Sequence, residues 1–181
     1  MTVIDINPQD PALAGCMATY SGQIVNLWNV DQDTITLDDI AHGLAYNCRW
    51  NGHTKAWYSI AEHCIRVHDR APAELQLLAL FHDAEEAYWG DMIRPLKMML
   101  KSGYPELLEK MKQTRRAIFQ KFGIEDGDGY KTFDDEELKW DFQNLILDLK
   151  HRPMSPELAK TAWLSRAHSL LFARDRNCNS A

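Results

Sequence analysis

One histidine and four acids follow an apolar run in the stretch LLALFHDAEEAYWGDM, residues 77–92: His82, Asp83, Glu85, Glu86 and Asp91. Burying an unpaired charge is unfavourable, so such groups in a protein are neutralised, paired or bound to a metal. If this segment is helical, His82 and Glu86 lie one turn apart on one face and Asp83 projects beside them. A divalent cation would neutralise the carboxylates and accept a lone pair from the imidazole. The stretch alone leaves two interpretations open, a metal site and a buried histidine with paired acids.

His63 and Asp141 are further candidates on two other predicted helices. His63 lies one turn from Ile60 and Val67, at the edge of an apolar stripe, where a core histidine would also be found. Asp141 lies within or just beside the apolar stripe formed by Leu138, Phe142, Leu145 and Leu149. An acid in that position needs either a cation or a buried partner.

Other acids and a second His-Asp pair are expected to have lesser parts. Asp148 lies further out than Asp141 and competes with it as the candidate ligand, or instead supports a site from behind its ligands. The consecutive acids at residues 134–137 are predicted to form a solvated first turn, where negative charge suits the helix dipole. His68 and Asp69 point away from the apolar stripe and have arginines nearby, so we interpret them as a surface pair.

Helices must position these residues, because helical periodicity runs through most of the chain. Apolar residues spaced i, i+3, i+4, i+7 and i+8 predict a helix after Thr36, and Ser59-x-x-Glu62 is a capping box that predicts another. Pro95 is expected to end or kink the helical segment around it. The sequence also predicts one short strand within residues 22–29, a loop in RWNGHTKAWY, a central helix over residues 73–89, and helices over residues 105–122, 134–150 and 155–176. We therefore expect an all-α fold of about five to seven helices in a single compact bundle. Residues 1–181 would form one domain with its core at about residues 35–173.

Composition and charge disfavour several functional classes. The chain has 181 residues, a formal net charge of -6 and no long basic run, so a nucleic-acid polymer is not an expected partner. A small phosphorylated ligand held by a few local cations is compatible with this charge. No apolar run approaches the roughly 20 residues that a membrane helix needs, and residues 1–16 lack the pattern of a secretory signal. No C-x-x-C pair occurs among Cys16, Cys48, Cys64 and Cys178, so the pattern does not fit a zinc ribbon. Counting cysteines leaves disulfides open, and reduced thiols in a cytoplasmic protein are the simpler expectation.

The order His63, His82-Asp83, Asp141 resembles the H…HD…D pattern of the HD-domain metal-dependent phosphohydrolases, over roughly residues 35–150. The resemblance is strongest to bacterial 5'-deoxynucleotidases and to phage HD enzymes that dephosphorylate dATP. In those proteins the first histidine closes an AEH-type stretch, and an Arg-Trp pair precedes it by about fourteen residues, as Arg49-Trp50 does here. Their pattern HD-x-x-E-x-x-x-G-D-x-x-x-P-x-K is matched by His82, Asp83, Glu86, Gly90, Asp91, Pro95 and Lys97. The chain departs from them at Trp140, where relatives often have an alanine before the last aspartate.

The resemblance implies an HD-domain helical bundle that holds one divalent transition metal, Co, Mn, Zn, Fe or Ni. The implied ligands are His63, His82, Asp83 and Asp141. Glu86 and Asp91 would orient or deprotonate a water or protonate the leaving oxygen, and in some relatives they hold a second divalent ion. The implied substrate-binding residues are Arg49, Trp50, Arg94 and Lys97.

The leading hypothesis is an enzyme that removes phosphate from deoxynucleotides, either a 5'-monophosphate or a triphosphate such as dATP. It would work as a homo-oligomer in a bacterial or phage-infected cytoplasm. Three alternatives stay open. One is an HD phosphodiesterase that acts on another small phosphoester. The second is a non-catalytic HD regulator that binds metal or nucleotide, and the third is a helical interaction protein whose acids are merely paired.

Overall fold

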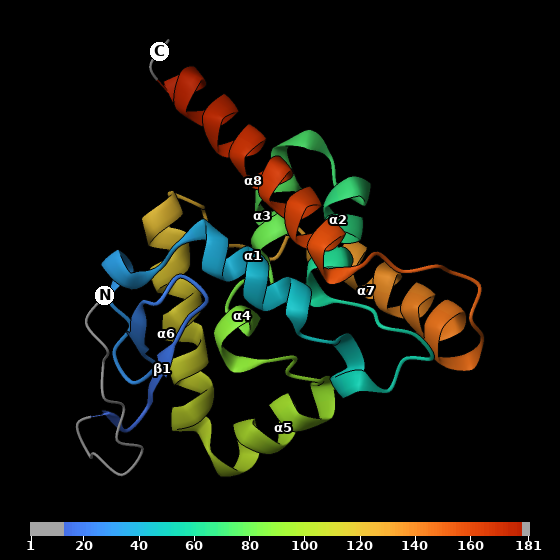
Figure 1. The fold of residues 1–181 in the computed structure, drawn as a ribbon, viewed down its shortest axis with the longest axis horizontal. Helices are drawn as coiled ribbons and strands as arrows, with labels where there is room; N and C mark the ends of the chain where they lie inside the picture. Colours follow the sequence, from blue (N-terminus) through green and yellow to red (C-terminus); the bar gives the residue numbers. More distant parts are fainter. Residues whose placement is uncertain (1–12, 179–181) are drawn as a thin grey trace.

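The computed structural model describes residues 13–178, and this part of the chain is mainly helical with one small hairpin (Figure 1). The predicted all-α class is confirmed. The helices are α1 (Leu37–Tyr46), α2 (Ile60–Arg70), α3 (Gln76–Phe81), α4 (Glu86–Trp89), α5 (Arg94–Gly103), α6 (Pro105–Phe122), α7 (Lys131–Asp141) and α8 (Pro156–Cys178). The hairpin pairs β1 (Cys16–Ala18) with β2 (Ile24–Asn26), so the predicted strand has a partner that the sequence did not reveal.

Helices α1, α2, α3 and α8 pack around the main core, with α8 lying across the other three (Figure 1). Both predicted caps are present: the Thr36 side chain accepts from the Asp39 backbone N–H, and the Ser59 side chain accepts from that of Glu62. Trp163 of α8 is fully buried, and its indole N–H donates to the Leu80 carbonyl at 3.2 Å. This tie fixes α8 on α3 and thereby supports the turn that follows α3.

The prediction of one central helix over residues 73–89 is wrong, because the chain turns in the middle of this segment. A short turn at Ala73–Leu75 leads into α3, and α4 begins only at Glu86. Between them, backbone hydrogen bonds close over three residues: Ala84 N–H donates to the Phe81 carbonyl at 3.0 Å and Glu86 N–H to the Asp83 carbonyl at 2.9 Å. Such bonds tighten the turn relative to an α-helix. His82 and Glu86 therefore do not share the continuous helical face that the sequence predicted.

Two other predicted helices differ in their bounds. Pro95 is the second residue of α5, where a missing N–H is harmless, rather than the end of a helix. The helix predicted over residues 134–150 ends at Asp141 as an α-helix and continues as a wider π-helical turn at Phe142–Leu147. The fully buried Asp141 therefore stands where the helical geometry changes.

Gly43 lets α1 approach α4 closely. A Cβ added at Gly43 would lie 2.6 Å from the carbonyl oxygen of Ala87 and 2.9 Å from its Cα. We expect Gly43→Ala to lower the free energy of unfolding by ~1–3 kcal/mol through overpacking, measured by urea denaturation. Gly103→Ala is the matched control, because a Cβ there would meet no atom within 4 Å. A Gly43→Ala protein as stable as wild type would contradict this close approach.

Some expectations concern residues outside the described range. Residues 1–12 are not described, so the expectation about a secretory signal lies outside the structure, and so does the side chain of Cys178. Cys16, Cys48 and Cys64 are free thiols, as expected. Among residues 13–178, every helix is too short or too polar to span a bilayer.

Candidate metal centre

His63 of α2 meets His82 and Asp83 of the turn between α3 and α4. One ligand atom from each of the three lies within 4.8 Å of the other two. Asp83 Oδ2 is 3.2 Å from His82 Nε2 and 3.9 Å from His63 Nε2. Both imidazoles are buried, with ring centroids 5.2 Å apart. Three of the four predicted metal ligands therefore converge on one point.

The backbone sets the tautomer of His82. Its Nδ1 lies 2.7 Å from the Ala79 carbonyl oxygen. Because a carbonyl can only accept, Nδ1 carries a proton, so Nε2 is the nitrogen whose lone pair a metal would bind once the ring is neutral. That Nε2 atom is buried and has no hydrogen-bond partner among the described residues. A nitrogen oriented in this way by its own backbone is typical of metal-binding histidines.

Two acids of α7 lie on opposite sides of the His63 ring. Asp134 Oδ1 is 3.1 Å from Nε2, and Asp141 Oδ2 is 3.5 Å from Nδ1. Asp141 is fully buried, and its Oδ1 has no hydrogen-bond partner within the described part of the chain. The prediction of a solvated turn is wrong for Asp134, whose side chain is only 23% exposed. Asp134 and Asp141 are two helical turns apart, so they share one face of α7.

Glu137 also contradicts the predicted solvated turn. It is fully buried, and its carboxylate accepts hydrogen bonds from Arg66 and, at 2.6 Å, from Arg70 of α2. The Arg66 guanidinium lies 3.5 Å over the Trp140 ring. These contacts between α2 and α7 fix the distance between His63 and the two acids beside it.

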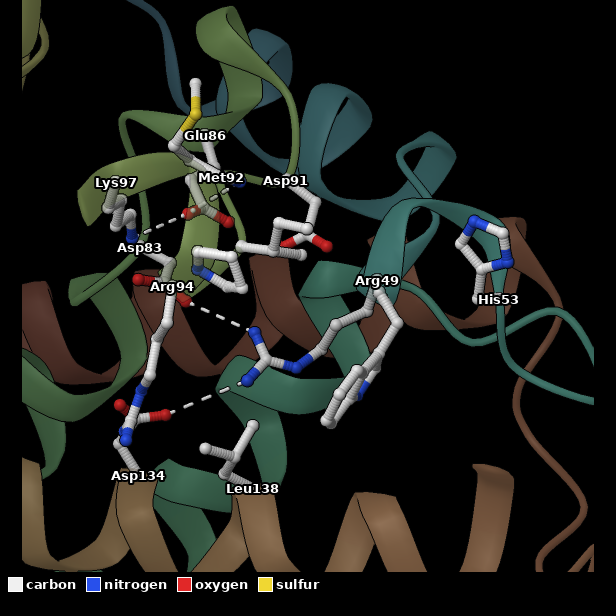
Figure 2. A pocket seen from close by; sticks show the side chains of 13 residues that line it. Arg49, His53, Asp83, Glu86, Asp91, Met92, Arg94, Lys97, Asp134 and Leu138 are labelled. Atoms are coloured by element: carbon white, nitrogen blue, oxygen red, sulfur yellow. Dashed lines mark hydrogen bonds and ion pairs between the residues drawn. The ribbon is translucent and has the colours of Figure 1, made fainter. Parts of the chain in front are cut away.

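The Arg49 guanidinium lies among the acids of the centre (Figure 2). Its Nε is 3.0 Å from Asp141 Oδ2, and its other nitrogens lie 3.6 Å from Asp83 and 3.9 Å from Asp134. Burial opposes the charge of Arg49, but these carboxylates outweigh burial and raise the pKa of the guanidinium above its ordinary value. Arg49 therefore stays charged and buried beside the cluster.

The same acids have lowered pKa values. Burial alone would raise the pKa of Asp83, but the charge of His82 outweighs it and holds that pKa well below its ordinary value. Burial likewise opposes the charge of Asp134, but the hydrogen bond with His63 lowers its pKa to about 2. Burial would lower the pKa of His82, and Asp83 raises it well above its ordinary value instead. A metal that binds here must displace a proton from this pair, so its affinity rises with pH.

The backbone beside Arg49 is strained. Trp50 and Asn51 have φ values of +59° and +49°, in the left-handed region that L residues rarely adopt. Asp91 Oδ2 accepts a hydrogen bond from the Asn51 backbone N–H at 3.0 Å. Asp91, predicted to be an acid or base, therefore also holds the turn that carries Arg49 and Trp50.

A cavity of about 290 Å³ opens over the centre (Figure 2). All the side chains predicted for catalysis or substrate binding line it: Arg49, Trp50, Glu86, Asp91, Arg94 and Lys97. Of the predicted metal ligands, Asp83 lines the wall of this cavity. Asp134, which was not predicted as a ligand, lines it too. Sequence reasoning missed Met92, Ile93 and Leu138, which make part of the wall apolar. These apolar residues follow no motif that the sequence displays.

The buried Glu86 pairs with the partly exposed Lys97 at the cavity wall. Lys97 Nζ lies 3.0 Å from Glu86 Oε1, which also accepts from the Met92 backbone N–H at 3.2 Å. Burial is the largest influence on Glu86, and with the nearby charge of Asp83 it raises the pKa of Glu86 to about 8, although Lys97 opposes the shift. A carboxyl group with a pKa near neutrality can both give and take a proton at physiological pH.

Arg94 and His68 have surroundings other than those that the sequence predicted. Arg94 lines the cavity, but its guanidinium binds Asp135 at an exposed position on the rim. Asp69, of the second His-Asp pair, is half exposed and binds Arg166 of α8 at 3.1 Å, as a surface residue would. Its neighbour His68 is buried, which the surface interpretation did not predict.

No model of a known protein family matches the chain. It is 39% identical over 113 residues to an uncharacterized protein of Rhodobacter capsulatus, in a region that covers 58% of this chain and 56% of that protein. It is 36% identical over 106 residues to the uncharacterized protein YfdR of Escherichia coli strain K12, covering 59% of this chain and 57% of YfdR. The matches thus span little more than half the length of these curated relatives. Neither relative's name assigns an activity.

Proposed function

We propose that this chain is an HD-type, divalent-metal-dependent phosphohydrolase that removes phosphate from deoxynucleotides. The observation that carries the proposal is the convergence of His63, His82 and Asp83, whose ligand atoms lie within 4.8 Å of one another. Asp83 stands in the wall of a cavity that also contains Arg49 and Lys97. Carboxylate and imidazole ligands beside cationic side chains suit a metal that handles a phosphate group.

The buried polar atoms of the centre fit a transition metal. His82 Nε2 and Asp141 Oδ1 are buried without hydrogen-bond partners among the described residues, and both are metal-ligating atoms. We keep Asp141 as the fourth ligand for this reason, with His63, His82 and Asp83 as the others. A set of two imidazoles and two carboxylates favours Mn, Fe, Co, Ni or Zn over Mg. When bound, such a cation would polarise a phosphoryl oxygen and lower the pKa of the attacking water.

The chain's own side chains have distinct parts in the proposed reaction. Arg49 and Lys97 offset phosphate charge, Arg49 as a planar fork and Lys97 as a point charge. Glu86 carries the proton that the water loses or that the leaving oxygen gains, because its pKa of about 8 suits either transfer. Trp50 and the apolar wall contact the base or sugar. The contacts of Glu86 with Lys97 and of Asp91 with a backbone N–H favour one metal over two.

The test is hydrolysis of deoxy- and ribonucleoside mono-, di- and triphosphates with Mn, Co, Zn or Mg, with products separated by chromatography. We expect release of phosphate from the deoxynucleotides that depends on transition metal. No hydrolysis of any nucleotide, from folded protein with one metal per chain, would overturn the proposal. Turnover of other phosphoesters alone would then favour the phosphodiesterase alternative. From the resemblance we also propose that the protein is a cytoplasmic homo-oligomer. Light scattering measures the number of copies in the oligomer.

The choice between Asp141 and Asp134 as fourth ligand gives a separate prediction. We expect Asp141→Asn to weaken metal binding at least ~100-fold, because it removes a buried charged ligand, whereas Asp134→Asn weakens it much less. Isothermal calorimetry with Mn or Co measures both affinities. The opposite order would make Asp134 the ligand and Asp141 the residue that orients His63 through Nδ1.

A further inference from the structure

A second cavity, of about 270 Å³, adjoins the first. Asp83 and Lys97 line both cavities, and His82 lines the second. The metal centre therefore stands at the junction of two cavities. Each volume lies near the lower end of the roughly 300–1,000 Å³ typical of small-ligand pockets, which suits one ligand that extends across both.

The second cavity is rich in cations, unlike the partly apolar first one. Its wall contains five cationic side chains: Lys97, Lys112, Arg115, Arg116 and Lys131. Four acids also line it, and one of them, Asp83, belongs to the metal centre. With Asp83 assigned to a metal, five cations face three acids. This excess of positive charge favours an anionic ligand.

Helix α6 supplies cations to both the inner wall and the rim. Arg115 is half-buried on the inner wall, donates to the His82 carbonyl and lies 3.0 Å from Asp126, so it is held in place. Lys112 and Arg116 are one turn apart and exposed. Lys112 lies in no ion pair with a described residue, and the Arg116 pair with Glu109 is solvent-exposed. Exposed ion pairs contribute little to stability, so a phosphate group can displace this one.

We propose that the second cavity binds the phosphates beyond the one at the metal centre, which makes the substrate a deoxynucleoside triphosphate rather than a monophosphate. This inference rests on the proposed function. The base and sugar occupy the first cavity beside Trp50, the α-phosphate lies at Asp83, and the β- and γ-phosphates extend toward Lys112 and Arg116. Water adds to the α-phosphorus, the bond from that phosphorus to the sugar O5' breaks, and the products are the deoxynucleoside, which takes a proton on O5', and inorganic tripolyphosphate. A monophosphate would leave the second cavity without a ligand.

The test compares two double variants that each remove two exposed cations. Lys112→Gln with Arg116→Gln removes the rim of the second cavity. Lys101→Gln with Lys139→Gln is the matched control, because both lysines are exposed and line neither cavity. We measure kcat/KM for a deoxynucleoside triphosphate and its monophosphate, and the affinity for inorganic tripolyphosphate by calorimetry, which needs no turnover.

We expect wild type to prefer the triphosphate, and the ratio of the two kcat/KM values to fall about tenfold or more in the rim variant only, because that variant loses charge-assisted contacts with the added phosphates. Tripolyphosphate affinity should fall by a similar factor. A wild-type preference for the monophosphate, or equal tripolyphosphate affinity in both double variants, would overturn the inference and leave the phosphohydrolase in place. No hydrolysis of any nucleotide would overturn the proposed function, and the tripolyphosphate affinities would still decide whether the second cavity binds phosphates.

Discussion

Asp83→Ala is expected to remove both metal binding and phosphate release from a chain that stays folded. Asp83 supplies a carboxylate oxygen that lies between the two rings, 3.2 Å from His82 Nε2 and 3.9 Å from His63 Nε2. Its loss removes one of the two charged ligands and leaves the two imidazoles with Asp141 alone. Because a catalytic cation contributes several kcal/mol to the transition state, we expect the rate to fall on the order of 10³-fold.

Three measurements on the purified variant test this expectation. Elemental analysis gives the metal per chain, and chromatography gives the rate of hydrolysis. Thermal unfolding adds a third reading, since a metal at about 100 times its Kd stabilises the folded state by ~2.7 kcal/mol. We expect wild type to show this stabilisation and Asp83→Ala to lack it.

The second His-Asp pair supplies the matched control. Asp69→Ala removes the same chemical group from the same dipeptide, but Asp69 binds Arg166 and lies outside both cavities. It should keep its metal, its rate and its metal-induced stabilisation. If Asp83→Ala behaves like Asp69→Ala, the three-residue cluster is not the metal centre and the interaction-protein alternative gains support.

Local signals in the sequence predicted the elements that present His63, but not the turn that presents His82. The Ser59 cap and the apolar stripe of α2 are short-range patterns, and both are present. The break after Phe81 has no such signal, because no Gly or Pro occurs between residues 76 and 89. Tertiary packing and the bond from His82 Nδ1 to the Ala79 carbonyl accompany the turn there.

The acids of α7 show a different limit of sequence reasoning. Four consecutive acids at a helix start indicated solvent, yet Asp134 faces His63 and Glu137 is buried against α2. The seven-residue spacing from Asp134 to Asp141 could have identified Asp134, because it places both on one face. Nothing local could have identified Glu137, whose partners Arg66 and Arg70 lie about seventy positions away.

Glu86→Gln is expected to abolish the proposed hydrolysis while making the metal-free protein less sensitive to alkaline pH. Loss of a group that transfers a proton typically lowers the rate ~10²–10⁴-fold. Stability changes for another reason. The pKa of Glu86 is raised from an ordinary 4.5 to about 8 in the folded chain, with burial the largest cause. Between these two values the folded state holds a proton that the unfolded state has lost, so stability falls as pH rises.

The sign and size of this effect distinguish a functional acid from a structural one. The stability that the protonated carboxyl preserves is fully present below pH 4.5 and is lost by about pH 8. Between pH 5 and pH 8 the free energy of unfolding of wild type should therefore fall by on the order of 3 kcal/mol more than that of Glu86→Gln, at ~1.4 kcal/mol per pH unit. Urea denaturation of metal-free protein at both pH values measures the difference, with the exposed Glu125→Gln as control. A Glu86→Gln protein that parallels wild type across this range would refute the raised pKa. One that is destabilised at both pH values, yet active, would make Glu86 a packing residue rather than the group that transfers the proton.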